Sequence, residues 1–198
     1  MKTFIACAVG ALLLTTPALA LDMTGVTTCS LHGFSTDTDP AGTNVRAAPD
    51  KDAPILGQLP PQQNAEGAGA VGVVLEIVGS KNGWLLIHSA SSGDPSVDAV
   101  TPVFKKPGWI SGDLVGFIVG SSELLDAPNP GGNVVATLQN TAKGIGPDSY
   151  TVKKVNGCNG KFADITVQLP ASIKPNAPEL RGWASKVCGN QVATCDPY

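Results

Sequence analysis

Residues 43–49 read Thr-Asn-Val-Arg-Ala-Ala-Pro, and residues 55–59 follow with Ile-Leu-Gly-Gln-Leu. In the first stretch Val45 and Ala47 alternate with polar residues, which is the pattern of a short strand with one buried face. Pro49 lacks a backbone N–H and fixes its own φ, so a strand ladder ends there. The two stretches therefore predict two short strands joined by a polar turn.

Two further landmarks follow in order along the chain. A glycine turn leads into Trp84, and the dipeptide Gly108-Trp109 comes later. Together with the Asn-Val-Arg-x-x-Pro stretch and the apolar-Gly-x-Leu run, these landmarks resemble the bacterial SH3-like (SH3b) domain family. The resemblance implies a small β-barrel. It also implies attachment to cell-wall peptide or to another envelope protein, through loops on a rigid scaffold.

The same pattern recurs in the second half of the chain. The matched pieces are residues 45–49 with 124–128, residues 72–79 with 150–157, Trp84 with Phe162, and Gly108-Trp109 with Gly182-Trp183. Their offsets stay between 74 and 79 residues, as a duplicated unit requires. The second copy lacks the Asn and Arg of the opening motif, so its place in the family depends on spacing and on the Gly-Trp pair.

The predicted fold class is all-β, with two tandem small SH3-like barrels, closely packed, after a cleaved signal peptide. The first barrel is residues 43–119 and the second, divergent barrel is residues 121–198, while residues 21–42 form an N-terminal lead segment. The junction at residues 120–122 is too short for a flexible linker, so the barrels are expected to touch. The 23 glycines and 16 prolines suit many short strands and tight turns.

The N-terminus predicts export. Residues 1–20 contain a lysine, a short apolar run and the small-x-small sequence Ala18-Leu19-Ala20, as in a secretory signal peptide cut before Leu21. No later stretch is apolar and charge-free over about 18 residues, so membrane insertion is not expected. The protein is thus expected to be periplasmic or extracellular. A formal net charge of −3, with scattered basic residues, argues against nucleic acid as a partner.

Four cysteines remain after the signal peptide, namely Cys29, Cys158, Cys188 and Cys195. An exported chain meets an oxidising compartment, so two disulfides are expected. If all four are paired, a bridge from Cys29 must join the first half of the chain to the second. The favoured pairing is Cys158 with Cys188 or Cys195, and Cys29 with the other, although sequence alone leaves the connectivity open. A metal site is disfavoured, because no Cys-x-x-Cys or paired histidine accompanies the cysteines.

The sequence offers little for catalysis. It holds neither Gly-x-Ser-x-Gly nor the phosphate-binding Gly-x-x-x-x-Gly-Lys-Ser/Thr. The letters Gly-x-Gly-x-x-Gly occur at residues 67–72, but they precede a Val-rich strand instead of opening a helix. A cysteine–histidine hydrolase would need a reactive thiol near His32 or His88. Two barrels fill the mature chain, so we expect no enzyme activity, no catalytic residue, no cofactor and no metal.

Candidate binding residues lie in the first motif, at the glycine turn and in two long loops. Each loop precedes a Gly-Trp pair, at residues 89–107 and 168–181, and long loops in compact folds are often functional. Because the elongation occurs twice, the loops are hypothesised to form a paired surface that contacts a partner, the alternative being tolerated insertions. Trp109 and Trp183 are expected in the core. The candidates are Arg46, Trp84, Phe104, Lys105, Lys106, Ile173 and Lys174. For Arg46, bracing of the first loop is favoured over binding of a carboxylate.

These features predict an exported, non-enzymatic SH3-like binding module that contacts cell-wall peptide or an envelope protein. Aromatic residues make up 5% of the chain, so protein or peptide contact is favoured over sugar stacking. The alternative is an inhibitor or immunity-type protein that blocks a hydrolase with an extended loop. A third interpretation is a small wall hydrolase that uses paired carboxylates.

Overall fold

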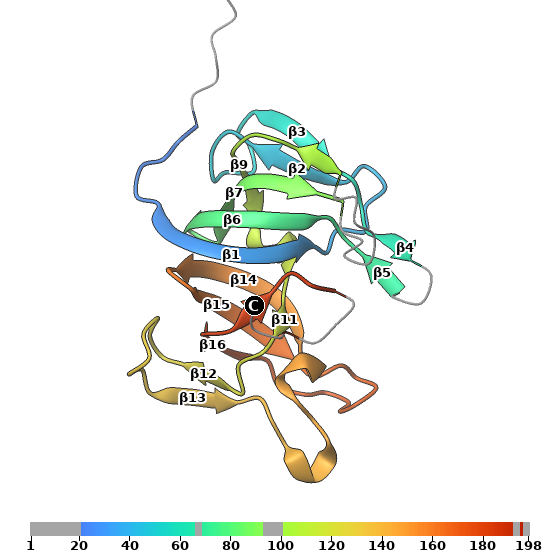
Figure 1. Ribbon diagram of the computed structural model, residues 1–198, viewed down its shortest axis with the longest axis vertical. Helices are drawn as coiled ribbons and strands as arrows, with labels where there is room; N and C mark the ends of the chain where they lie inside the picture. The colour runs from blue at the N-terminus through green and yellow to red at the C-terminus, as the bar shows by residue number, and fades with distance from the viewer. Residues whose placement is uncertain (1–20, 66–68, 93–100, 192–194, 196–198) are drawn as a thin grey trace, which may run out of the picture.

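The computed structural model describes residues 21–65, 69–92, 101–191 and 195. These residues form strands, turns and three short 3-10 helices, η1 (Gly112–Leu114), η2 (Thr141–Lys143) and η3 (Pro147–Ser149), so the all-β prediction is confirmed (Figure 1). The expected signal peptide lies outside the described residues. No helix among the described residues combines the length and the apolar character that a membrane crossing needs.

The first sheet holds eight strands. Seven follow one path, β10 (Val115–Gly116), β1 (Thr27–Ser35), β6 (Val74–Lys81), β7 (Trp84–Ser91), β9 (Gly108–Ser111), β2 (Thr43–Arg46) and β3 (Ile55–Leu59). The eighth, β8 (Pro102–Phe104), pairs with β7 off this path, and a separate hairpin joins β4 (Gln63–Ala65) to β5 (Gly69–Val71). The opening motif thus forms the two strands β2 and β3 that its alternation predicts.

The second sheet holds five strands, in the order β13 (Val134–Thr137), β12 (Glu123–Leu125), β16 (Leu180–Ala184), β15 (Phe162–Gln168) and β14 (Thr151–Asn159). A further pair of short strands, β11 (Ile118–Val119) and β17 (Val187–Cys188), forms a ribbon of its own. Figure 1 shows this second sheet below the first, with β14 next to β1.

The two sheets repeat one arrangement. The order β3-β2-β9-β7-β6 in the first matches β13-β12-β16-β15-β14 in the second. The breaks in strand register also recur. In the first sheet the register of β6 and β7 shifts before Gly79, which lies opposite Leu86, and in the second sheet the register of β14 and β15 shifts before Gly157, which lies opposite Asp164. The internal repeat predicted from spacing therefore corresponds to a repeated strand topology.

The turn after the first strand of each unit is also repeated in its backbone hydrogen bonds. The N–H of Ala47 donates to the carbonyl of Pro54 at 2.9 Å, and 79 residues later Asp126 donates to Asn133 at 2.9 Å. In the same turn Asp50 N–H donates to the Ala48 carbonyl at 2.8 Å, as Asn129 donates to Ala127 at 2.9 Å. Residues 47 and 126 are therefore structurally equivalent.

Closure of the sheets into barrels is not seen in the strand pairing of the described residues. The path of the first sheet begins at β10 and stops at β3, and that of the second begins at β13 and stops at β14. The barrel interpretation of each unit therefore stays a prediction beyond the all-β class.

The segment expected as an N-terminal lead contains strand β1, which lies inside the first sheet between β6 and β10. Leu31, Gly33 and Ser35 alternate inward along β1, while His32 is exposed. The polar composition of this strand concealed it in the sequence, because only one of its inward residues is a large hydrophobe. Tertiary pairing with β6 is what makes it a strand.

One hydrophobic cluster runs through both halves. It contains equivalent residues from each unit, such as Val45 and Leu124, or Ile77 and Val155, all of them fully buried. Each unit alone offers a small core, and a shared core removes more apolar surface from water. The prediction that the units touch therefore agrees with the observed packing.

Covalent and polar contacts join the halves. Disulfides connect Cys29 to Cys158 and Cys188 to Cys195. The favoured pairing, in which Cys158 joined one of the two C-terminal cysteines, is therefore wrong, although a bridge from Cys29 does link the first half to the second. Thr28 and Ser30 exchange backbone hydrogen bonds with Gly160, which brings β1 beside the β14–β15 turn and aligns the two sulfurs.

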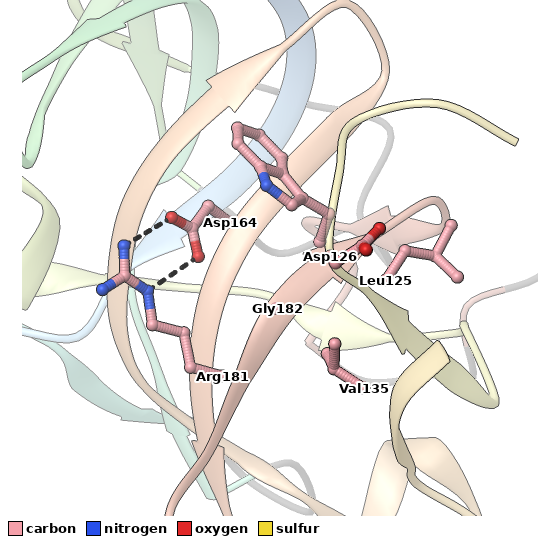
Figure 2. Close-up of a pocket in the computed structure, with 7 residues that line it drawn as sticks. Leu125, Asp126, Val135, Asp164, Arg181 and Gly182 are labelled. Atoms are coloured by element: carbon pink, nitrogen blue, oxygen red, sulfur yellow. Dashed lines mark hydrogen bonds and ion pairs between the residues drawn. The ribbon is translucent and has the colours of Figure 1, made fainter. Parts of the chain in front are cut away.

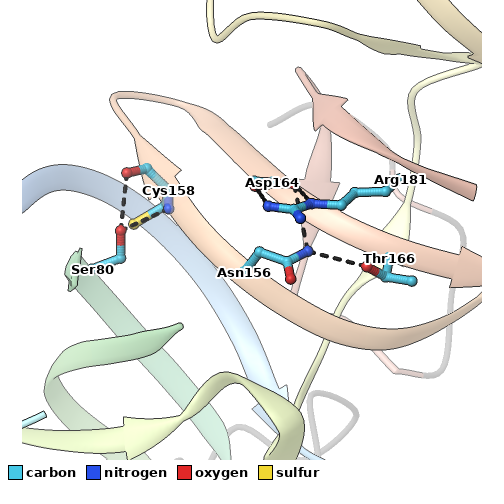
Figure 3. A network of polar contacts seen from close by, with 6 residues as sticks. All are labelled: Ser80, Asn156, Cys158, Asp164, Thr166 and Arg181. Carbon is cyan, nitrogen blue, oxygen red and sulfur yellow. Dashed lines mark hydrogen bonds and ion pairs between the residues drawn. The ribbon is translucent and has the colours of Figure 1, made fainter. Parts of the chain in front are cut away.

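Ser80 provides the buried polar contact at this interface. Its hydroxyl accepts a hydrogen bond from the Cys158 N–H at 2.8 Å and donates to the Cys158 carbonyl at 3.1 Å (Figure 3). At the other end of the interface, the side-chain amide of Gln191 binds the N–H and the carbonyl of Gly72 at 2.7 and 2.8 Å. The C-terminal segment is thus tied back to the first half.

Gly112 is expected to tolerate no side chain at the contact between the halves. A Cβ there would overlap the carbonyl oxygen of Val155 and lie 2.8 Å from that of Gly83. We expect Gly112→Ala to lower the free energy of unfolding by about 1–3 kcal/mol in urea titrations, because backbone atoms must move. Gly131→Ala is the matched control, since its Cβ would meet only the Asn129 side chain at 3.3 Å. Equal losses in the two variants would contradict the tight contact.

Candidate binding site

An open pocket of about 300 Å³ lies on the second sheet. Figure 2 shows it between the strand that carries Arg181 and the chain around Leu125 and Asp126. Its lining residues are Leu125, Asp126, Val135, Asp164, Arg181, Gly182 and Trp183. The pocket thus combines one aromatic ring, aliphatic side chains and three charged groups.

Strand register brings these side chains together. Trp183 on β16 lies opposite both Leu125 of β12 and Asp164 of β15. Side chains two residues apart on a strand point to the same face, so Arg181 joins Trp183 there. Because Arg181 is opposite Thr166, it reaches Asp164 along the diagonal, a distance that a long side chain can span.

A bidentate ion pair forms the polar wall. The Arg181 Nε donates to one Asp164 oxygen at 3.1 Å and Nη2 donates to the other at 2.7 Å (Figure 3). The Asp164 side chain is 13% exposed and that of Arg181 is 63% exposed. The hydrogen bonds from Arg181 to Asp164, and then their opposite charges, raise the pKa of the guanidinium. The guanidinium is therefore charged at neutral pH.

Asn156 supports the ion pair from β14. Its side-chain amide donates to Thr166 Oγ1 at 3.1 Å and lies 3.5 Å from Asp164 Oδ1. Asp164 thus accepts hydrogen bonds from two sides, which fixes its orientation. Of the guanidinium nitrogens, Nη1 makes no hydrogen bond among the described residues, so it is available to a ligand.

Asp126 lies in the turn at the pocket edge. The side-chain amide of Asn133 and its backbone N–H both donate to the Asp126 carboxylate, each at 2.8 Å. These bonds, the side-chain one first, lower the pKa of Asp126 below its ordinary value. The carboxylate is therefore negative over a wider pH range than a free aspartate.

Asn133→Ala is expected to raise the pKa of Asp126 toward the ordinary aspartate value of about 3.9. A lowered pKa in the folded state stabilises the fold above the unfolded-state pKa, and this contribution is lost as the pH falls through the folded-state pKa. As the pH falls, the Asn133→Ala variant should therefore lose the stabilising contribution of Asp126 at a higher pH than the unchanged chain does. The measurement is an NMR titration of the Asp126 side-chain carbon.

Asp22 supplies the internal reference for that titration. Its pKa is also lowered, first by the Thr24 N–H and then by Lys81. Among the described residues, neither Thr24 nor Lys81 forms a hydrogen bond with Asn133. The pKa of Asp22 should therefore stay unchanged in the Asn133→Ala variant. An unchanged Asp126 pKa would show that the Asn133 side chain does not bind the carboxylate, because the backbone N–H stays in the variant.

The predicted binding residues of the first half are dispersed. Arg46 on β2 donates from Nη1 to the Ala53 carbonyl at 2.8 Å, so its side chain closes the first loop. Trp84 is half-buried at the start of β7. Phe104 is only 7% exposed and packs beside Gly57. Burial removes Phe104 from any contact surface, because its ring is part of the core.

The other loop candidates do reach the surface. Lys105 and Lys106 are exposed, and the Lys106 Nζ lies 5.7 Å from the centroid of the Phe104 ring. Ile173 is 47% exposed and Lys174 is exposed next to it, in the loop before β16. Part of the first loop, residues 93–100, lies outside the described residues, so the paired-loop surface stays a hypothesis.

Trp183 departs from the expectation of a core position. Trp109 is fully buried, whereas Trp183 is half-buried and lines the pocket. The pocket residues Asp164 and Arg181 were also absent from the sequence candidates. The available signal was alternation, since Asp164 and Thr166 place polar groups on one face of a strand whose other face is apolar.

Groups for catalysis or metal binding are not gathered in the described part of the chain. His32 and His88 are exposed on different strands, and Cys29, Cys158, Cys188 and Cys195 are all in disulfides. No group of three or more histidine, cysteine or acidic side chains lies close enough to hold a metal ion among the described residues.

Comparison with known proteins finds no family model, no curated protein and no solved structure that matches the chain. The two halves can still be compared with each other. Their strand order and turn hydrogen bonds agree, so the face around Trp183 has a structural counterpart around Trp109.

Proposed function

We propose that this chain is an exported, non-enzymatic binding module built from two divergent SH3-like units. The motif in residues 43–59 and the repeated strand order support this assignment. Two disulfides suit an oxidising compartment, either the periplasm or the extracellular space. The proposal includes no cofactor, no metal, no nucleic acid and no insertion into a membrane.

The open pocket beside Trp183 is the observation that carries the proposal. A partly exposed tryptophan next to an arginine is the residue combination that dominates binding energy at protein interfaces. The ion pair holds Arg181 in one orientation, so little side-chain entropy is lost on contact. The target is cell-wall peptide or an envelope protein that places a polar chain in this pocket.

One observation favours the alternative, an inhibitor that blocks a hydrolase. The loop that presents Ile173 and Lys174 is held by the N–H groups of both residues, which donate to the Pro170 carbonyl at 2.9 and 3.0 Å. Gln168 closes the same loop by donating to the Ala177 carbonyl at 2.7 Å. A braced loop with an exposed apolar tip has the form that inserts into a cleft.

Affinity capture tests the two functions. The mature chain, its Trp183→Ala variant and an Ile173→Ala/Lys174→Ala variant are immobilised and exposed to envelope extract and to sedimented murein. We expect the mature chain to retain murein or an envelope protein, and Trp183→Ala to lose it. The loop variant is the matched control and should bind as the unchanged chain does.

The inhibitor function predicts the opposite pattern. One soluble hydrolase would be retained, its activity would fall on addition of the chain, and only the loop variant would lose both effects. Retention of neither class of partner by the unchanged chain would overturn the binding-module proposal. Loss of turbidity in a murein suspension would overturn its non-enzymatic part.

A further inference from the structure

The equivalent outer faces of the two units differ in what covers them. In the first unit Trp109 is 0% exposed, and the backbone of Asp22 lies against it. In the second unit Trp183 occupies the equivalent strand position but is half-buried and lines the open pocket. The first unit therefore shows how a polypeptide segment covers this face.

The covering segment is attached through the backbone of a single residue. The N–H of Asp22 donates to the carbonyl of Ala47 at 3.2 Å. The carbonyl of Asp22 accepts a hydrogen bond from Trp109 Nε1, also at 3.2 Å. Farther along, Val26 packs on Gly79 beside Leu86. One acceptor and one donor on the face thus bind the N–H and the carbonyl of the same residue, a pairing that an extended backbone also makes.

The second unit has both groups, and in the described part of the chain neither has a partner. Residue 126 is equivalent to Ala47 by the repeated turn hydrogen bonds. Its carbonyl oxygen accepts no hydrogen bond from a described residue, and Trp183 Nε1 donates to none. Both residues line the pocket, so by this equivalence the counterparts of the acceptor and donor that bind Asp22 are unpaired there among the described residues.

Charge differs between the two faces. In the first unit Lys81 forms an ion pair with Asp22 at 3.0 Å. The residue equivalent to Lys81 in the second unit is Asn159, which has no charge. The pocket instead carries two aspartates and one arginine, and Arg181 is already paired with Asp164. A basic side chain thus fits where the first unit holds an aspartate.

The open part of the face is short. Its far end, at Gly157, faces the hydroxyl of Ser80 from the first unit, which lies 3.2 Å from where a Cβ would be. Gly157 is equivalent to Gly79, where Val26 packs in the first unit. A bound segment therefore has room for the counterparts of residues 21–23, but not for that of Val26.

We propose that the Trp183 face binds a short extended segment of a partner protein in the way that the backbone of Asp22 binds beside Trp109. One residue of the partner donates its N–H to the Asp126 carbonyl and accepts from Trp183 Nε1, and its side chain is basic. This inference depends on the proposed binding function and selects an envelope protein over cell-wall peptide as the partner.

Blocked tetrapeptides test the pairing. The probes are acetylated, amidated Ala-Leu-Asp-Met, which is the sequence of residues 20–23, its Asp-to-Lys version, and the Lys version with a methyl group on the lysine backbone nitrogen. Each is titrated to millimolar concentration into the isotope-labelled mature chain, with the Gly182 amide and the Arg181 Nε–H as NMR reporters. We expect the Lys peptide to bind severalfold more tightly than the Asp peptide, and the methylated peptide to lose binding.

Two conservative variants separate the indole donor from general packing. Trp183→Phe keeps an aromatic ring but lacks the N–H, so Lys-peptide affinity should fall about two- to tenfold, as expected for one hydrogen bond. Tyr150→Phe is the matched control, because Tyr150 is also half-buried but does not line the pocket. That variant should bind the peptide as the unchanged chain does.

Specific outcomes would overturn the inference. The first is that the Lys peptide causes no reporter shifts, and the second is that the methylated peptide binds as tightly as the Lys peptide. The third is that the shifts depend on protein concentration alone, which would identify a second copy of the chain as the occupant. Saturable shifts with a soluble murein stem peptide, but not with the Lys peptide, would also overturn it. Capture of a partner independent of Trp183 would leave the binding module standing and remove this site from it.

Discussion

Replacing Cys29 and Cys158 together by serine is expected to lower the free energy of unfolding by about 5 kcal/mol. The disulfide closes a loop of 129 residues, and in the chain-entropy account a longer loop leaves the unfolded chain more restricted. It also cross-links the two halves, so its loss removes a constraint that holds β1 beside the β14–β15 turn. Urea unfolding of the unchanged and double-serine chains measures the difference.

The second disulfide gives the matched comparison. Cys188 and Cys195 are seven residues apart, so Cys188→Ser/Cys195→Ser should cost about 2 kcal/mol by the same account. Both variants remove two sulfurs and one cross-link, and they differ in loop length. If the Cys29→Ser/Cys158→Ser chain lost no more unfolding free energy than the Cys188→Ser/Cys195→Ser chain, the Cys29–Cys158 bridge would not stabilise the fold by restricting the unfolded chain.

Trp109→Ala is expected to cost about 3–5 kcal/mol, the range for a fully buried large aromatic side chain. Trp109 is 0% exposed and donates its indole N–H to the Asp22 carbonyl. The substitution leaves a cavity and also removes an attachment of the covering segment. Urea unfolding gives the loss, and faster hydrogen exchange at the Asp22 amide should accompany it.

Trp183→Ala is the natural counterpart, because the two tryptophans are equivalent in the repeat. Trp183 is half-buried, so less surface returns to water and we expect a loss below about 2 kcal/mol. A loss as large as that of Trp109→Ala would mean that both rings belong to the core. The open pocket would then carry no binding function.

The disulfide pattern illustrates what local sequence leaves undecided. The four cysteines that follow the predicted signal peptide predict two bridges, and the position of Cys29 predicts a link between the halves. Which cysteine it meets depends on the packing of β1 against the β14–β15 turn. That packing involves residues more than 120 positions apart, so no local pattern reports it.

The candidate site also depends on contacts between strands that the local sequence does not predict. The motifs drew attention to Arg46, Trp84 and the long loops, but Phe104 is buried. The pocket instead depends on a diagonal contact between Asp164 and Arg181, which follows from the pairing of β15 with β16. Register between two strands is set by tertiary packing, so the ion pair was not readable from either strand alone.

The sequence by itself determined the all-β class, the duplicated unit and the number of disulfides, because alternation, turn residues and cysteine count are local or compositional properties. Only the tertiary structure decided that β1 belongs to the first sheet, which cysteines pair, and that Trp109 is covered while Trp183 is open. The physical reason is that burial is decided by whatever packs on a face. Two nearly equivalent strands therefore differ when the segment around Asp22 covers one of them and not the other.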